Sequence, residues 1–338
     1  MRDVERSIDE KVQFLRASEA YPNRPSNVEV METHWSWVFI AGEHVYKLKK
    51  PVVSEYFDFT SLEAREANCR KEVFLNRRLA GDIYEGVAPI AVDVNGILSI
   101  GGAGKIIDWL VVMRRLPADR MLDQLISRKS LDPRQLHRLA ERLARFYAGQ
   151  PRSAIGPEAY VARFAREQAI SRVMLAKIDR ERLAAYVLLL DRLDAALMCT
   201  RPLLEDRVRS GLIVDGHGDL RPEHICLIDP IVIFDCLEFD DGLRQVDSVD
   251  ELTFLGLECA MLGAPSIGPK LIEDVLAQLE QTAPKQLIAF YTAFRALLRV
   301  RLSLVHLFDP VVRQPEKWRP QADRYAKIAK SALAELGV

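Results

Sequence analysis

One stretch of the chain, Val214-Asp-Gly-His-Gly-Asp-Leu-Arg-Pro-Glu-His224, concentrates side chains that can carry out chemistry. Within eight residues it holds two histidines and an aspartate: His217, Asp219 and His224. An apolar run over 231–234 follows and ends at Asp235, eleven residues after His224. A carboxylate at the end of a strand is a common ligand for Mg²⁺. The stretch therefore predicts a functional loop, with Asp235 as a candidate metal ligand.

Upstream of this stretch, the first third of the chain has the pattern of a β-rich lobe. A two-residue turn at Gly42-Glu43 is expected to join the last two of three strand-like runs, which are 28–32, 37–41 and 44–49. Thr60-Ser-Leu-Glu63 has the form of a capping box and predicts a helix that continues to about Ala80. More strand-like runs follow at 86–94, 97–100 and 106–116.

After residue 116 the pattern becomes helical. Helices are predicted over 133–147, 157–167 and 179–208, and again from about 240 to the C-terminus. The β-rich stretch 212–239 interrupts them. We therefore expect an α+β fold of two lobes, a small β-rich one over 1–116 and a larger helical one over 117–338.

Composition excludes several classes of protein. The 47 lysines and arginines are balanced by 48 acidic residues, so there is no net basic field that would hold a long nucleic acid. No apolar run approaches the roughly 18 to 20 residues of a membrane span. The five cysteines are scattered without a CxxC pair, which predicts free thiols and a cytoplasmic protein.

The segment from His217 to His224 resembles the catalytic loop of the aminoglycoside phosphotransferase and protein-kinase-like superfamily, whose pattern is H-x-D-x-x-x-x-N. Val232-Ile-Phe-Asp-Cys-Leu-Glu238 is similar to the family's downstream segment with the metal-binding Asp. Further matches lie at 35–39, 45–51 and 75–79, and the resemblance covers roughly residues 28 to 310. It implies a bilobal protein-kinase-like fold and a kinase that uses ATP or GTP with Mg²⁺.

The resemblance also implies roles for residues of the loop. Phosphoryl transfer depends mainly on positioning and on neutralising charge. Asp219 would orient or accept the proton of the acceptor hydroxyl, and Asp235 would bind Mg²⁺. Arg221 would lie near the transferred phosphate. His217 would support the loop by hydrogen bonding.

His224 departs from the family pattern, because it stands where the family has a metal-binding Asn. An imidazole nitrogen can coordinate a divalent ion, but Mg²⁺ prefers oxygen whereas Mn²⁺ tolerates nitrogen better. His224 is therefore a candidate metal ligand that would favour Mn²⁺.

In a kinase-like lobe, a strand lysine pairs with the nucleotide phosphates and with a glutamate on the next helix. Lys47 and Lys49 share one face of their strand, and the resemblance favours Lys47, with Lys49 as the second choice. Glu66 and Glu72 are both candidates for the glutamate. Both lie near the apolar stripe of the helix, and the resemblance favours Glu72, which fits the family pattern of a glutamate followed by apolar residues three and seven positions later.

Two further segments are expected to contact the nucleotide. No G-x-G-x-x-G is present. The segment 32–36 stands where a phosphate-binding loop is expected, and the hydroxyls of Thr33 and Ser36 could bind there. The stretch 111–117 resembles the last strand and hinge, with Met113 to Leu116, Arg115 among them, as candidates for contact with the base.

The acceptor is less well defined by the sequence. The seven acidic residues of the stretch that begins at Asp235 and ends at Glu251, both included, could attract a cationic small molecule. They could equally structure the loop and cap a helix that opens near Ser248.

Three other functional readings stay open at this point. Replacement of the metal-binding Asn by His224 would suit a nucleotide-binding regulatory protein with weakened catalysis. Leu220-Arg-Pro-Glu223 is similar to a protein-kinase motif. The spacing of Asp215, His217 and Asp219 locally resembles that of binuclear metallophosphoesterases.

Overall fold

The computed structural model describes residues 6–54, 56–178, 180–308 and 312–338. The chain divides into two units, one comprising residues up to 121 together with 224–242, and the other comprising 122–223 and 243–338. The division into functional lobes at 1–116 and 117–338 stays a prediction. The two units and the two predicted lobes differ over residues 224–242. The short strands of this stretch pair with each other, and the second of them lies against the helix 62–80 of the first unit.

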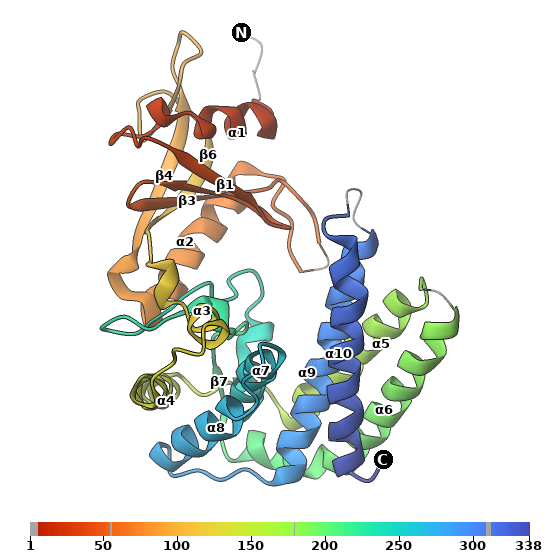
Figure 1. Cartoon of the computed structure of the whole chain (residues 1–338). Coiled ribbons are helices and arrows are strands. Elements are labelled where there is room, and N and C mark those ends of the chain that lie inside the picture. Colours follow the sequence, from red (N-terminus) through yellow and green to blue (C-terminus); the bar gives the residue numbers. More distant parts are fainter. Residues whose placement is uncertain (1–5, 55, 179, 309–311) are drawn as a thin grey trace. The chain divides into compact units, whose positions relative to one another are not determined.

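The first unit is built on a six-stranded antiparallel sheet with the strand order β1-β2-β3-β6-β4-β5 (Figure 1). Its elements are α1 Ile8–Arg16, β1 Val28–Glu32, β2 Ser36–Ala41, β3 His44–Lys49, α2 Leu62–Ala80, β4 Tyr84–Val92, β5 Leu98–Ile100, β6 Lys105–Arg114, β8 Ile225–Cys226 and β9 Val232–Ile233. The predicted turn at Gly42-Glu43 is confirmed, because Ala41 pairs with His44 and Gly42 has φ 66°.

The two faces of this sheet are covered by different helices, as Figure 1 shows for α1 and α2. Tyr46, Leu48 and Leu110 belong to the apolar cluster that includes α1 residues. Trp109 and Val111, which alternate with Leu110, belong to the cluster with α2. Side chains alternate along a strand, so Lys47 and Lys49 of β3 project from the face opposite to Tyr46 and Leu48, toward α2.

The start of α2 corrects one sequence-based prediction. The N-cap is Ser61, whose hydroxyl accepts a hydrogen bond from Ala64 N at 3.1 Å, and the helix begins at Leu62. The expected capping box from Thr60 to Glu63 is wrong by one position. Thr60 instead donates its hydroxyl to Asp58 at 2.6 Å, so it closes the preceding turn rather than the helix.

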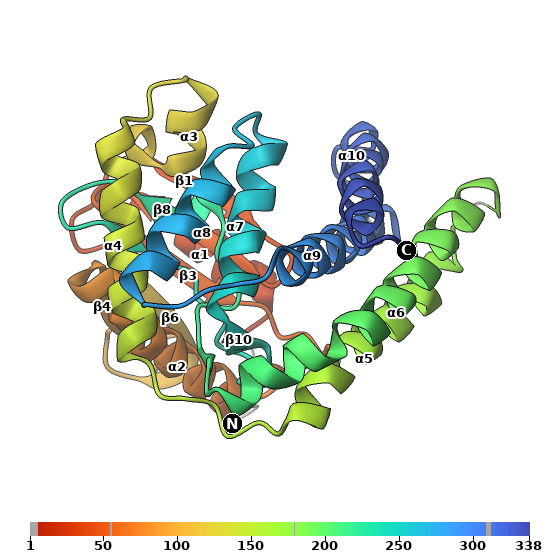
Figure 2. The same cartoon turned by 90° about the horizontal axis from the view of Figure 1, so that it is seen from below.

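The second unit is mainly helical, and Figures 1 and 2 show α5 beside α6 and α9 beside α10. Its elements are α3 Leu122–Ser127, α4 Pro133–Gly149, α5 Pro157–Leu175, α6 Arg180–Arg209, β7 Ile213–Asp215, β10 Gln245–Asp247, α7 Ser248–Met261, α8 Ile267–Gln278, α9 Lys285–Val305 and α10 Pro315–Glu335. The predicted helices are confirmed, with α5 longer than expected. Asp179, the expected start of the third, lies outside the described residues.

Within the described ranges, no helix has the length and apolar character needed to cross a bilayer. All five cysteines are free thiols, as their scattered spacing predicts.

Candidate functional site

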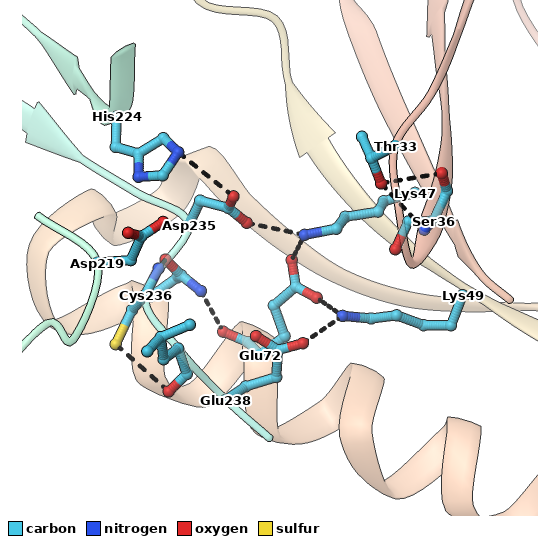
Figure 3. A network of polar contacts seen from close by, with 12 residues as sticks. Thr33, Ser36, Lys47, Lys49, Glu72, Asp219, His224, Asp235, Cys236 and Glu238 are labelled. Carbon is cyan, nitrogen blue, oxygen red and sulfur yellow. Dashed lines mark hydrogen bonds and ion pairs between the residues drawn. The ribbon is translucent and has the colours of Figure 1, made fainter. Parts of the chain in front are cut away.

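In the first unit, β3, α2 and the segment after β9 contribute charged side chains to one network (Figure 3). Lys47 Nζ lies 3.0 Å from Glu72 Oε1 and 2.8 Å from Asp235 Oδ1. Lys49 Nζ contacts the other oxygen of Glu72 and lies 2.5 Å from Glu238 Oε1. The two lysines that the sequence offered as alternatives therefore share Glu72.

The other candidate glutamate, Glu66, is not part of this network. It accepts hydrogen bonds from Arg70, one turn further along α2 on the outer surface, at 2.7 and 2.9 Å. Glu72 lies on the buried face of the helix instead and has no exposed surface.

The backbone around Asp235 is held by two residues that sequence reasoning missed. Asn76, one turn after Glu72 on α2, accepts a hydrogen bond from Cys236 N at 2.9 Å. Tyr84 Oη accepts one from Asp235 N at 3.4 Å. Asp235 itself has φ 61°, a left-handed conformation that is uncommon for residues other than glycine and that aspartate tolerates better than most. Asn76 falls within residues 75–79, one of the stretches that resemble the family, and this resemblance could have marked it as a candidate.

Lys47, Glu72 and Asp235 stabilise one another's charged forms, as the directions of their pKa values show. Burial alone would raise the pKa of Glu72 and of Asp235, but the Lys47 ammonium, with that of Lys49, lowers the pKa of Glu72 and holds that of Asp235 well below its usual range. Burial would likewise lower the pKa of Lys47, and the carboxylates of Asp235 and Glu72 raise it instead. With Glu238, three carboxylates face two ammonium groups. The Asp235 side chain is 40% exposed while that of Glu72 is fully buried, so the accessible negative charge lies on Asp235.

Asp235 fits a divalent cation. One carboxylate oxygen contacts Lys47, and the other, Oδ2, lies 3.6 Å from His224 Nε2. An ionised, partly exposed carboxylate is a hard oxygen donor of the kind Mg²⁺ prefers. Over the described ranges no three His, Cys, Asp or Glu side chains form a metal cluster. Mg²⁺ is commonly held by only one or two carboxylates together with substrate phosphates, so a single protein carboxylate suits that ion.

The remaining candidate nucleotide contacts lie outside this network. Thr33 Oγ1 donates to Ser36 O and accepts from Ser36 N, both at 3.0 Å, so it closes the turn between β1 and β2. Met113 pairs with Val45 in the sheet. Arg115 is exposed, with its side chain 3.1 Å from Glu29 and its backbone N–H bonded to Glu43 O. Contacts of Ser36, Met113 and Arg115 with a nucleotide remain predictions.

In the second unit, a buried carboxylate organises the loop that follows β7. Glu251 of α7 accepts hydrogen bonds from His217 N at 3.0 Å and from Gly218 N at 2.6 Å. Tyr147 of α4 donates its hydroxyl to the same carboxylate at 2.8 Å. A Cβ on Gly216 would lie 2.4 Å from Val246, so the loop requires glycine there. Sequence reasoning did not identify the role of Glu251.

This anchored loop presents Asp219. Its backbone N–H donates to Nδ1 of the buried His217 at 3.3 Å. The supporting role of His217 in catalysis stays a prediction. The residue that follows Asp219, Leu220, is fully buried. The Asp219 side chain is 30% exposed, and Arg221 Nη1 lies 3.8 Å from its Oδ2 while Arg221 Nη2 contacts Glu223. The loop thus exposes a carboxylate beside a guanidinium.

The acidic run from Asp235 to Glu251 is largely neutralised inside each unit. Asp247 caps α7 through Val249 N at 2.9 Å and pairs with Arg207 at 2.7 Å. Asp250 pairs with Arg295 at 2.7 Å. These contacts favour the structural reading of the run over attraction of a cationic acceptor.

Asp215, the first residue of the metallophosphoesterase-like spacing, lies 2.7 Å from Arg244 Nε through its Oδ1. This contact and the lack of a His, Cys, Asp and Glu cluster among the described residues give that reading no support.

Comparison with known proteins places the fold. No family model matches the chain. Uncharacterized proteins of Mycobacterium tuberculosis and Mycobacterium bovis are 33% identical over 293 residues, which cover 82% of this chain and 55% of theirs. The chain thus spans about half the length of the curated relatives it matches.

Three solved structures share the fold at low sequence identity. A choline/ethanolamine kinase family protein from Mesorhizobium loti has a TM-score of 0.54 at 16% identity, over 97% of this chain and 98% of that one. A choline kinase from Streptococcus pneumoniae has 0.52 at 14%, over 97% and 100%. A spectinomycin phosphotransferase in complex with ADP and spectinomycin has 0.51 at 14%, over 92% and 94%. The chain has the protein-kinase-like fold, as the resemblance of its loop implied.

Proposed function

We propose that the protein is a kinase that transfers the γ-phosphate of ATP or GTP, with Mg²⁺ or Mn²⁺, to a hydroxyl of a small molecule. The observation that carries this proposal is Lys47, whose ammonium bridges the buried Glu72 and the accessible Asp235. This arrangement supplies a lysine for phosphate oxygens and a charged oxygen for a divalent ion.

Each residue would have a limited task, because phosphoryl transfer requires positioning more than covalent chemistry. Lys47 would bind phosphate oxygens, and Asp235 would hold the metal ion, with His224 as a second ligand. A bound ion would neutralise charge on the phosphates. Asp219 would orient the acceptor hydroxyl and receive its proton, while Glu251 and His217 keep the loop in place. Arg221 would offset charge on the transferred group.

The acceptor we propose is a small molecule, since the three structures with the same fold are, by their names, a choline/ethanolamine kinase family protein, a choline kinase and a spectinomycin phosphotransferase. The neutralised acidic run gives no reason to restrict the acceptor to cations. A test panel should therefore contain amino alcohols, amino sugars and neutral polyols.

The proposal is tested by incubating the full chain with ATP or GTP, Mg²⁺ and each acceptor, and by detecting the phosphoester by mass spectrometry. We expect metal-dependent product with at least one acceptor class and none without the ion. Nucleotide binding without transfer to any acceptor would support the regulatory alternative instead. Absence of nucleotide binding would overturn both.

His224→Asn tests the second metal ligand. If the imidazole coordinates, the wild-type protein should work better with Mn²⁺ than with Mg²⁺, and the variant should shift that ratio toward Mg²⁺ by roughly 10-fold. The exposed His137 on α4 offers a control, His137→Asn, which should leave the ratio unchanged. Initial rates with each metal at equal free concentration measure the effect. Identical ratios in His224→Asn and wild type would exclude coordination.

A further inference from the structure

A second ion pair lies beside the one that the proposed function uses. Lys49 Nζ lies 2.5 Å from Glu238 Oε1 and also contacts Glu72. The Lys49 side chain is only 2% exposed, and Glu238 is buried as well. The ammonium of Lys49 is thus committed to carboxylates of the chain itself, which separates its role from that of the more accessible Lys47.

The two lysines fasten the segment 235–238 to the sheet at both ends. Lys47 binds its first residue, Asp235, and Lys49 binds its last, Glu238. Both project from the same face of β3, two positions apart, which is about 7 Å along a strand. These two ion pairs therefore hold the segment 235–238, which carries Asp235, in one position along β3.

Glu72 links the two ion pairs, with one carboxylate oxygen on each lysine. When a fully buried carboxylate loses its counterion, the folded protein is strongly destabilised. Lys47 has three donors and contacts Glu72 and Asp235 with its ammonium group. If binding of a phosphate draws Lys47 away from Glu72, the buried carboxylate needs another counterion. Lys49 provides that counterion, since its contact with Glu72 does not depend on Lys47.

We propose that Lys49 and Glu238 are positioning residues, which hold Asp235 in register for the metal ion and keep Glu72 paired while Lys47 serves the nucleotide. The proposal rests on the proposed function and deepens it. Neither residue would touch the nucleotide, the metal ion or the acceptor.

Single variants separate the two tasks. Glu238→Gln should raise the Mg²⁺ concentration needed for half-maximal nucleotide binding by about 10- to 100-fold, the range for residues that orient a metal ligand. Lys49→Met should weaken nucleotide binding by a similar factor, because Glu72 then retains Lys47. Both are measured by titration calorimetry well below each variant's Tm, so that loss of folded protein does not contribute. The control is Lys71→Met, which removes an exposed contact of α2 with Asp241 and should change neither quantity.

The double variant Lys49→Met/Glu238→Gln distinguishes positioning from stability alone. Removing both charges leaves no uncompensated Glu238, so Tm should return toward the wild-type value. The Mg²⁺ requirement should stay raised, because the Glu238 end of the segment is no longer tied to β3 and only the contact of Lys47 with Asp235 remains. Recovery of the Mg²⁺ requirement together with Tm would overturn the proposal, as would wild-type titrations in Glu238→Gln. Failure of the wild-type protein itself to bind nucleotide with Mg²⁺ would instead overturn the proposed function.

Discussion

Asp219→Ala should reduce phosphoryl transfer by about 100- to 10,000-fold and leave nucleotide affinity close to the wild-type value. The Asp219 carboxylate is 30% exposed, while the backbone of the loop after β7 is held by the buried Glu251 through His217 N and Gly218 N. Removing the carboxylate therefore takes away the proton acceptor without releasing the loop. Single-turnover transfer and a nucleotide titration on the same preparation measure the two quantities.

Asp219→Asn is the matched variant, because it keeps the size and polarity of the side chain. It should lose as much activity as Asp219→Ala if proton acceptance matters. A smaller loss would assign Asp219 an orienting role through hydrogen bonding alone. Transfer at the wild-type rate in Asp219→Ala would remove the residue from the mechanism.

The sequence was sufficient for the fold and for the face on which the key lysines lie. Alternation along 44–49 puts Lys47 and Lys49 on one side of a strand, and the structure shows that side facing α2. Alternation could not predict which lysine pairs with Glu72. In the structure both do, because each lysine contacts one of the two oxygens of this buried carboxylate. The spacing along α2 left both glutamates possible, and the resemblance to the family favoured Glu72. The structure places Glu72 on the buried face of the helix, whereas Glu66 is 33% exposed.

Contacts that depend on tertiary packing could not be predicted. The acidic run had two readings because its counterions are distant in sequence. Arg207 comes 40 residues before Asp247, and Arg295 comes 45 after Asp250. The same holds for Glu251, whose partner Tyr147 lies on another helix. Local pattern gives the face of a helix but not the side chain that meets it.

The backbone conformation of Asp235 likewise could not be predicted from the sequence pattern. A run of apolar residues predicts a strand that ends near Phe234, but the backbone at Asp235 is left-handed, and the N–H groups of Asp235 and Cys236 donate to Tyr84 and Asn76, which lie far away in the sequence. This geometry restricts which substitutions can test the residue. Asparagine is also tolerated in the left-handed region, whereas alanine would add backbone strain to the loss of charge.

Asp235→Asn should therefore remove the Mg²⁺-dependent part of nucleotide binding, by about 100-fold or more, while the fold stays intact. The amide keeps the shape and the backbone conformation but loses the ionised oxygen that a divalent ion requires. Lys47 keeps Glu72 as a partner, so the metal-independent part of binding should persist. Titrations with Mg²⁺ and with a chelator should differ for the wild-type protein and coincide for the variant. Asp241→Asn, in the same segment with a side chain that is 65% exposed, is the control and should behave as the wild type. Equal affinities with Mg²⁺ and chelator in the wild-type protein would mean that Asp235 holds no metal ion for the nucleotide.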